Sequence, residues 1–397
     1  MSQLKVDAIH SEDGGNSNIE LDDSRNTTCK GNLTVDGTTT LTGAVTLPAG
    51  TTSDTLSFRN LMINGAMQVN QRGTVANAGN QYGGPDRMFF FKNDGAMTVS
   101  QDTDVPTGQG FANSWKCDVT SVAGTAGNNY VGLQQKIEGQ NLQHVKKGTS
   151  NAEQLTLSFW IKSTKTGTYI AELWDEDNSR TCSKSYTVST TNTWEKKTIT
   201  FPADTTGALG NDNGDSFRVY LWFFAASGFS SGTLNTTWAA NTNANRAVGQ
   251  VNACDNTSNN IYITGLQLEI GSTATDFEHR PYQDELLKCW RYFYLQRSNC
   301  LNTGRGTGAS NCNFTIITPV NMRTTPSISL TASSGMRHYG IDSHSDSTTA
   351  PTVVAWRDTS NHILCDQAGH SGVNDDRVLT LMPNGSASEG IELNAEL

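Results

Sequence analysis

Alternating hydrophobic and polar positions mark the middle of the chain. Leu155, Leu157, Phe159 and Ile161 are separated by Thr, Ser and Trp. Because successive side chains of a strand point to opposite faces, this pattern predicts a strand with these four residues on one face. Residues 217–224 alternate in the same way, and we predict a second strand there.

Further strands are predicted in the same region, at 169–174, 199–201 and 261–270. In the last of these, the alternation changes phase at Gly265, which predicts a β-bulge. Many short strands separated by Gly, Asn and Asp turns are typical of an antiparallel sandwich. We therefore predict a jelly-roll domain over 56–282.

A shorter repeat precedes this region. Residues 31–48 contain three hexads, GNLTVD, GTTTLT and GAVTLP, each beginning with glycine. Their strand-like apolar positions include Leu33, Val35, Leu41, Val45 and Leu47. So short a repeat cannot bury its apolar edge alone, whereas three chains around one axis would cover it. We predict a homotrimeric β shaft over 31–55, preceded by an attachment segment at 1–30.

One short helix is predicted after the sandwich, beginning at Pro281. Its apolar stripe would consist of Leu286, Leu287, Trp290, Phe293 and Tyr294. Alternation typical of strands returns at 314–317, 327–330 and 378–382. Residues 283–397 are therefore predicted to form this helix and a small C-terminal β domain, and the fold class is all-β.

Composition narrows the possible partners. Charged residues make up 17% of the chain, and the net charge is -10. Nucleic acids and anionic membranes attract clustered Lys and Arg, so neither is a predicted partner. No stretch approaches the ~20 apolar residues of a membrane span, so no membrane insertion is expected. The amino-terminal residues show no secretory signal.

Eight cysteines are spread along the chain without a C-x-x-C pair. This spacing predicts reduced thiols in a protein assembled in a cytoplasm. The acidic run at 175–178 lacks the glycine and late glutamate of an EF-hand loop, and we predict solvated turns there and at 211–215. No metal and no cofactor are predicted.

Two stretches that bracket the predicted sandwich resemble receptor-binding tail fibres of tailed bacteriophages. The first reads NLMINGAMQVNQRGT at 60–74 and is followed by Asp86-Arg87. The second reads GLQLEIG at 265–271 and continues to Arg280-Pro281.

A later span, Met322-Arg323-x-x-Pro326, is similar to the strand after the helix in the same family. The resemblance implies a homotrimeric virion protein whose sandwich is like the jelly-roll carbohydrate-binding modules. Such modules often hold calcium through acids in the opening segment. Here residues 64–68 read NGAMQ and lack both acids, so calcium is not expected.

The alternation also predicts large aromatic side chains on outward faces. If Phe159 faces the core, Trp160 points away from it. By the same reasoning one outward face would carry the side chains Tyr220, Trp222 and Phe224, and Trp174 is a further candidate for it. Aromatic faces can stack on sugar rings. The alternative, which we favour, is that this face packs against a neighbouring subunit or under a loop.

Two histidines are further candidates for receptor binding. His344 and His370 lie in Gly-, Ser- and Asn-rich turns of the C-terminal domain, where exposed hydrogen-bonding groups are expected. The chain has no H-E-x-x-H motif, and we predict that it is not an enzyme.

Together these observations predict a virion structural protein: a homotrimeric tail fibre or tip that recognises a host-surface glycan or lipopolysaccharide. Residues 1–30 would dock on other tail proteins. Its location would be the virion tail, after assembly in the host cytoplasm. The alternative is an architectural adaptor that links tail proteins without binding a receptor.

Overall fold

The structure is a computed structural model. It describes residues 8–10, 17–21, 27–29, 58–297, 300–331, 335–339, 344–355, 361–370, 378–384 and 390–397. The chain divides into two compact units, Met1–Thr51 and Thr52–Leu397. The predicted hexad shaft at 31–55, with Leu33, Val35, Leu41, Val45 and Leu47, lies outside the described residues.

The first unit contains one small antiparallel sheet. Its strands, in the order β1-β2-β3, are β1 (Ala8–His10), β2 (Ser17–Leu21) and β3 (Thr27–Cys29). The second unit contains everything else described below.

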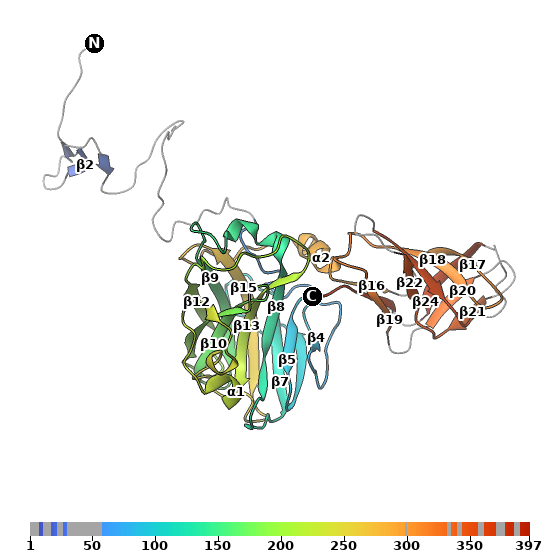
Figure 1. Cartoon of the computed structure of the whole chain (residues 1–397), viewed down its shortest axis with the longest axis horizontal. Helices are drawn as coiled ribbons and strands as arrows, with labels where there is room; N and C mark the ends of the chain where they lie inside the picture. Colours follow the sequence, from blue (N-terminus) through green and yellow to red (C-terminus); the bar gives the residue numbers. More distant parts are fainter. Residues whose placement is uncertain are drawn as a thin grey trace, which may run out of the picture. The chain divides into compact units, whose positions relative to one another are not determined.

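A sandwich of two antiparallel sheets forms the larger part of the second unit (Figure 1). The seven-stranded sheet runs in the order β14 (Ala239–Ala240), β11 (Arg180–Val188), β10 (Gly167–Asp175), β13 (Asp215–Ala225), β8 (Tyr130–Glu138), β5 (Phe89–Lys92) and β4 (Gln81–Tyr82). The five-stranded sheet runs in the order β12 (Glu195–Phe201), β9 (Leu155–Ser163), β15 (Asn260–Ile270), β7 (Ser114–Ser121) and β6 (Ala96–Asp102). The predicted all-β class is confirmed.

The sandwich core follows from the alternation in the sequence. Leu157, Phe159 and Ile161 of β9 are fully buried, as the pattern predicts. They share one core cluster with Val219 and Leu221 of β13 in the facing sheet. Burying these side chains between two sheets is the main hydrophobic contribution to the stability of the domain.

Two β-bulges change which side chains face the core. In β15 the register shifts between Thr264 and Gln267, which confirms the bulge predicted at Gly265. Gly265 has φ +63°, and a Cβ there would lie 2.6 Å from the ring of Phe111, so the position requires glycine.

A second bulge lies in β13, between Trp222 and Phe224. It adds one residue, so Phe223 and Phe224 both join the main core. The prediction that Phe224 shares an outward face with Tyr220 and Trp222 is therefore wrong.

The helix is shorter than its apolar stripe predicts. Helix α2 spans Tyr282–Trp290, whereas Phe293 and Tyr294 begin strand β16 (Phe293–Arg297). These two residues pair with Asn394 and Leu393 of β25. Pairing with a strand so distant in the sequence overrides the local helical pattern. Among the described residues, no helix is long and apolar enough to cross a membrane.

The remaining short helical turns lie in the loops of the sandwich. They are α1 (Ser227–Ser230) and the 3-10 turns η1 (Gly139–Asn141), η2 (Gln143–Val145) and η3 (Asn243–Asn245).

The C-terminal residues form two further antiparallel sheets around their own core. One has the order β16, β25 (Gly390–Asn394) and β19 (Ser327–Leu330). The other has the order β21 (His344–Ser347), β20 (Gly335–Tyr339), β24 (Val378–Asn384), β17 (Asn302–Gly306), β18 (Cys312–Ile317), β23 (His362–Gln367) and β22 (Thr352–Ala355). The strands predicted at 314–317, 327–330 and 378–382 are confirmed.

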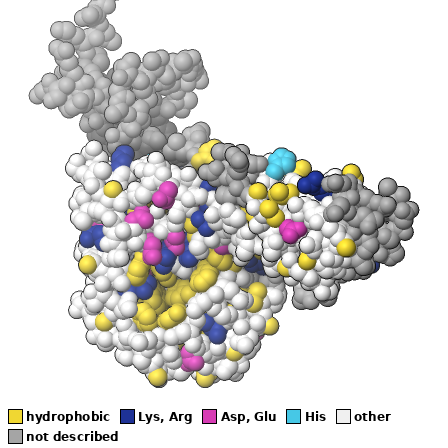
Figure 2. Space-filling view, turned by 45° about the vertical axis from the view of Figure 1, so that its right-hand side comes forward, with side chains coloured by type: hydrophobic (Ala, Val, Ile, Leu, Met, Phe, Trp, Pro, Cys, Tyr) yellow, Lys and Arg dark blue, Asp and Glu magenta, His cyan; other side chains and the backbone are white. Residues whose placement is uncertain are grey.

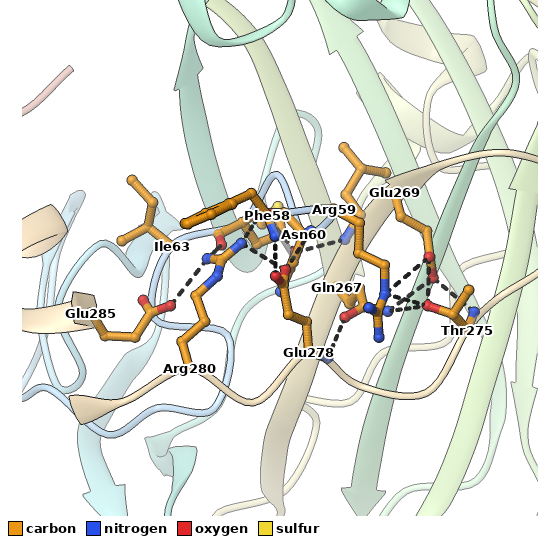
Figure 3. A network of polar contacts seen from close by, with 12 residues as sticks. Phe58, Arg59, Asn60, Ile63, Gln267, Glu269, Thr275, Glu278, Arg280 and Glu285 are labelled. Carbon is orange, nitrogen blue, oxygen red and sulfur yellow. Dashed lines mark hydrogen bonds and ion pairs between the residues drawn. The ribbon is translucent and has the colours of Figure 1, made fainter. Parts of the chain in front are cut away.

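Polar contacts close the sandwich where its first and last segments meet (Figure 3). Glu278 accepts the backbone N–H of Asn60 at 2.8 Å, and Arg280 donates to Glu278 at 2.9 Å and to Glu285 at 3.0 Å. Asn60 also donates through its side chain to the carbonyl of Leu266 at 3.1 Å. Several residues of the two phage-like segments therefore tie the start of the domain to its end.

Buried arginines join the sandwich to the C-terminal sheets. Arg87 is fully buried, forms an ion pair with Glu396, and lies 3.5 Å above the ring centroid of Tyr292. Arg72 reaches the same Glu396 at 3.1 Å and stacks on Phe293 at 3.7 Å. We call Arg72, Arg87 and Glu396 the arginine clamp.

Two further contacts extend the arginine clamp. Arg323 donates to the carbonyl oxygens of Ala395 and Asn213, at 2.8 and 2.9 Å. Arg291 donates two hydrogen bonds of 2.7 Å to the buried Glu138. Burial alone would raise the pKa of Glu138, but the donors Arg291 and Tyr292 more than offset it and hold the pKa below its ordinary value.

The seven cysteines whose side chains the structure describes are all free thiols, which agrees with the prediction from their spacing. Burial raises the pKa of Cys182, Cys312 and Cys365 to about 12 in each case. These thiols therefore stay protonated and unreactive at neutral pH.

We expect Arg87→Met to lower the free energy of unfolding by about 3 kcal/mol, because it leaves the buried Glu396 with a weaker partner. The control is Lys165→Met, since Lys165 pairs with Asp255 at a surface where both side chains are more than a third exposed. That change should cost less than about 1 kcal/mol. Urea denaturation measures both, and equal losses would contradict the role of the arginine clamp.

Candidate functional site

The outward face of the seven-stranded sheet carries two rows of side chains in register. The first row crosses four adjacent strands. Phe89 of β5 pairs with Gln134 of β8, and Gln134 also pairs with Tyr220 of β13. Tyr220 in turn pairs with Glu172 of β10. Because paired residues of adjacent strands point to the same face, these four side chains form a continuous line across the sheet.

The second row is formed by Phe91, Gly132 and Trp222. A Cβ on Gly132 would lie 2.3 Å from the Phe91 ring. Glycine at this position therefore leaves room for the ring. The Phe91 ring meets the Trp222 ring edge-on at 5.3 Å between centroids. Tyr220 stacks on Trp222 at 6.1 Å. The two rows together make an aromatic floor.

The segment 226–250 lies against part of this floor. Its Arg246 donates to both carboxylate oxygens of Glu172, at 2.8 and 3.0 Å, and Trp222 donates its indole N–H to the same carboxylate at 2.9 Å. The Arg246 guanidinium also lies 4.2 Å from the ring centroid of Trp174. Burial alone would lower the pKa of Arg246, but Glu172 raises it above its ordinary value, so the guanidinium stays charged.

An open hollow of about 530 Å³ remains beside this segment, and we call it the aromatic groove. Its aromatic lining consists of Phe89, Phe91, Tyr130, Tyr220, Trp222 and Phe229. Its polar lining consists of Asn80, Gln134, Lys136, Arg218, Asn243 and Arg246. Figure 2 shows hydrophobic side chains gathered on one face of the sandwich, with Lys and Arg side chains beside them.

Gln134 is the most informative polar residue of the aromatic groove. Only 4% of it is exposed, and its side-chain nitrogen has no hydrogen-bond partner in the structure. A buried amide donor without a partner costs about 1–3 kcal/mol. A ligand hydroxyl or a bridging water in the aromatic groove would remove that cost.

The structure brings together only some of the residues predicted for a site. Tyr220 and Trp222 line the aromatic groove, while Trp174 packs beside them under Arg246. Trp222 is 1% exposed because the chain itself covers most of it. This agrees with the interpretation that a loop covers the face.

The other predicted residues lie elsewhere. Trp160 lies on β9 of the five-stranded sheet and lines a separate hollow with Phe111 and His279. His370 is 2% exposed, with its Nε2 3.3 Å from the side-chain oxygen of Gln367, so the expectation that it is exposed is wrong. His344 belongs to β21, but its side chain lies outside the described residues.

Sequence reasoning missed most of the polar lining. Residues 130–138 alternate, with Val131 and Leu133 directed to the core. That alternation places Tyr130, Gln134 and Lys136 on the outward face, and it could have identified them. Arg218 could have been found in the same way on β13. Arg246 gives no such signal, because it lies in an irregular segment that reaches the sheet only in the folded chain.

The acidic turn at 175–178 differs from its prediction. Asp175 is fully buried and pairs with the ammonium of Lys147. The same ammonium lies 3.0 Å from Asp204 and donates to the carbonyls of Thr206 and Gly207, both at 2.9 Å. Carboxylate and carbonyl oxygens of this kind could hold a metal ion, but Lys147 supplies the positive charge here. No metal-binding cluster of His, Cys, Asp and Glu occurs in the described part of the chain.

Comparison with known proteins gives only distant likenesses. No family model matches the chain, and no curated protein matches it. Solved structures that are similar include the enzymatically active domain of tailspike protein 4 of bacteriophage CBA120, with 14% identity and a TM-score of 0.30 over 54% of this chain and 22% of that chain.

Two similar structures are carbohydrate-binding modules. TmCBM61, solved with β-1,4-galactotriose, has 11% identity and a TM-score of 0.28 over 54% of this chain and 99% of the module. The family 11 module of Clostridium thermocellum, solved with a mixed-linked tetrasaccharide, has 12% identity and a TM-score of 0.25 over 51% and 98%. Likenesses this distant carry no argument about function, which must rest on the groove itself.

We expect Arg246→Met to lower the free energy of unfolding by about 3 kcal/mol, because it leaves Glu172 buried without its cation. Hydrogen exchange of the amides in 226–250 should accelerate, since Arg246 ties this segment to the sheet. The control is Arg218→Met, because the Arg218 side chain is 20% exposed and pairs with Glu176 and Asp215 at the surface. Unchanged exchange in 226–250 would show that other contacts hold the segment.

Proposed function

We propose that the chain is a glycan-binding protein and that the aromatic groove is its binding site. The observation that carries the proposal is the buried amide nitrogen of Gln134, which has no hydrogen-bond partner and lies between Phe89 and Tyr220 on an aromatic floor. Sugars present C–H faces that stack on aromatic rings and hydroxyls that need hydrogen-bond partners. The lining of the aromatic groove offers both.

The same lining favours binding over cleavage. Its polar residues are amides, Lys and Arg, and none of its lining residues is Asp or Glu. Glycoside hydrolysis by the common route uses two carboxyl groups that flank the scissile bond. Glu172 lies at the end of the first row, where Arg246 and Trp222 donate hydrogen bonds to its oxygens. We therefore propose a non-enzymatic role.

We further propose that this glycan-binding domain belongs to a homotrimeric tail fibre of a virion. The proposal is supported by the hexad repeat at 31–48 and by the order of the phage-like segments in the sequence. The fibre would be assembled in the host cytoplasm, attach to other tail proteins through residues 1–30, and present three aromatic grooves to a host-surface glycan or lipopolysaccharide. Three weak sites that engage the same host surface at once would give a much higher overall affinity than one site alone.

We expect Gln134→Met to weaken glycan binding about tenfold, because it removes the hydrogen-bond donor and keeps the side-chain length. A glycan array probed with the full chain would identify the ligand, and titration would give the affinity. The control, Gln154→Met, changes an exposed glutamine outside the aromatic groove and should leave the affinity unchanged.

Three outcomes of this experiment would count against the proposal. Equal affinities of the two variants would place the sugar elsewhere. Failure of the wild-type chain to bind any glycan would favour the architectural adaptor. Release of shortened oligosaccharides would show that the chain is an enzyme.

The mass of the full-length protein in solution tests whether the chain forms a trimer. Light scattering of the full chain should give about three times 42.9 kDa, because the repeats need partner chains to cover their apolar edges. Deletion of 31–50 should shift the population toward monomer at micromolar concentration. A wild-type monomer under these conditions would contradict the proposed fibre, and it would leave the glycan site to be judged separately.

A further inference from the structure

A second cavity lies next to the aromatic groove, where the sandwich meets helix α2. Its volume is about 310 Å³, and its lining includes Lys136, Arg280, Lys288, Arg291 and His144. None of its lining residues is Asp or Glu. We call it the basic cavity. Lys136 lines both the aromatic groove and the basic cavity, so the two hollows are neighbours.

Three of these cations already pair with carboxylates: Lys136 with Asp215 at 3.4 Å, Arg280 with two glutamates, and Arg291 with Glu138. Glu138, which pairs with Arg291, has a fully buried side chain. Arg280 is held between Glu278 and Glu285, beside Phe58 and Ile63 (Figure 3). The positive groups therefore border the hollow, although the whole chain carries a net charge of -10.

Two groups of the basic cavity retain unused capacity for an anion. Among the described residues, no carboxylate lies within ion-pair distance of the Lys288 ammonium, whose recorded neighbour is the ring of Phe58 at 5.6 Å. The side chain of Arg280 is 8% exposed, and its Nε has no hydrogen-bond partner. Burial, and then the nearby Arg280, lowers the pKa of Lys288, although the carboxylates of Glu285, Glu278 and Asp284 oppose this lowering. An anion beside Lys288 would offset both effects.

We propose that the basic cavity binds the anionic group, a carboxylate or a phosphate, of a saccharide whose rings lie in the aromatic groove. This inference rests on the proposed glycan-binding function and specifies the class of glycan: an acidic one. Because Lys136 borders both hollows, a saccharide in the aromatic groove could place its charged substituent in the basic cavity. The cavity is large enough for one charged substituent with part of its ring, while Lys288 and Arg291 supply charge-assisted hydrogen bonds.

The first experiment uses simple anions with the full chain. Inorganic phosphate and D-glucuronate should bind, as observed by ligand NMR or calorimetry. Lys288→Gln should weaken both about tenfold. Lys165→Gln removes the same charge from a surface pair with Asp255 and should weaken them less than twofold. Equal effects of the two variants would show that binding follows net charge, and that would overturn the proposal.

The second experiment compares D-glucose, D-glucuronate and D-glucose 6-phosphate, which differ at a single carbon. At least one of the acidic sugars should bind about ten times more tightly than glucose, and Lys288→Gln should remove this preference. Comparison of the two acidic sugars identifies the preferred group. Affinity for glucose equal to that for both acidic sugars would overturn the proposal.

The two proposals can fail separately. Gln134→Met should leave the affinity for inorganic phosphate unchanged, because the aromatic groove does not take part in it. If phosphate binds in a Lys288-dependent way but no glycan binds, the glycan function fails and the anion cavity stands. If neutral glycans bind through Gln134 but no anion binds, the glycan function stands and the basic cavity is refuted.

Discussion

Burial of arginine side chains between the sandwich and the C-terminal sheets is the constraint on which the rest of the second unit depends. Arg87 is fully buried, so its charge must be matched within the protein. Glu396, near the last strand, supplies the match, and Tyr292 and Phe293 cover the guanidinium groups of Arg87 and Arg72. A charge pair of this kind fixes geometry more than it adds stability, because its desolvation offsets much of the attraction.

Buried ion pairs also border both of the proposed binding hollows. Beside each hollow a buried glutamate is paired with an arginine, while basic and amide side chains line the hollow. Glu172 holds Arg246 against the aromatic floor, and Glu138 holds Arg291 beside the basic cavity. The arginine clamp sets the position of Tyr292, which lines the basic cavity. The contacts that join the parts of the second unit therefore also define one wall of a site.

The segments that resemble phage fibres have an architectural role in the described structure. Asn60 and Arg280 tie the start of the sandwich to its end, and Arg72, Arg87 and Arg323 join it to the C-terminal sheets. None of these residues lines the aromatic groove. These residues therefore stabilise the fold, although Asn60 and Arg280 also line the basic cavity.

The sequence by itself determined the all-β class, the strands with a period of two, the bulge at Gly265 and the free thiols, because each follows from neighbours along the chain. Tertiary structure alone decided the end of the helix, since Phe293 pairs with Asn394. It also decided that the Phe224 side chain faces the core and that Asp175 is buried in an ion pair with Lys147. The candidate site was predicted only in part: alternation identified Tyr220 and Trp222, but Arg246 reaches them from an irregular segment. Contacts between residues far apart in the sequence leave no periodic trace, and for that physical reason the aromatic groove and the basic cavity became visible only in the folded chain.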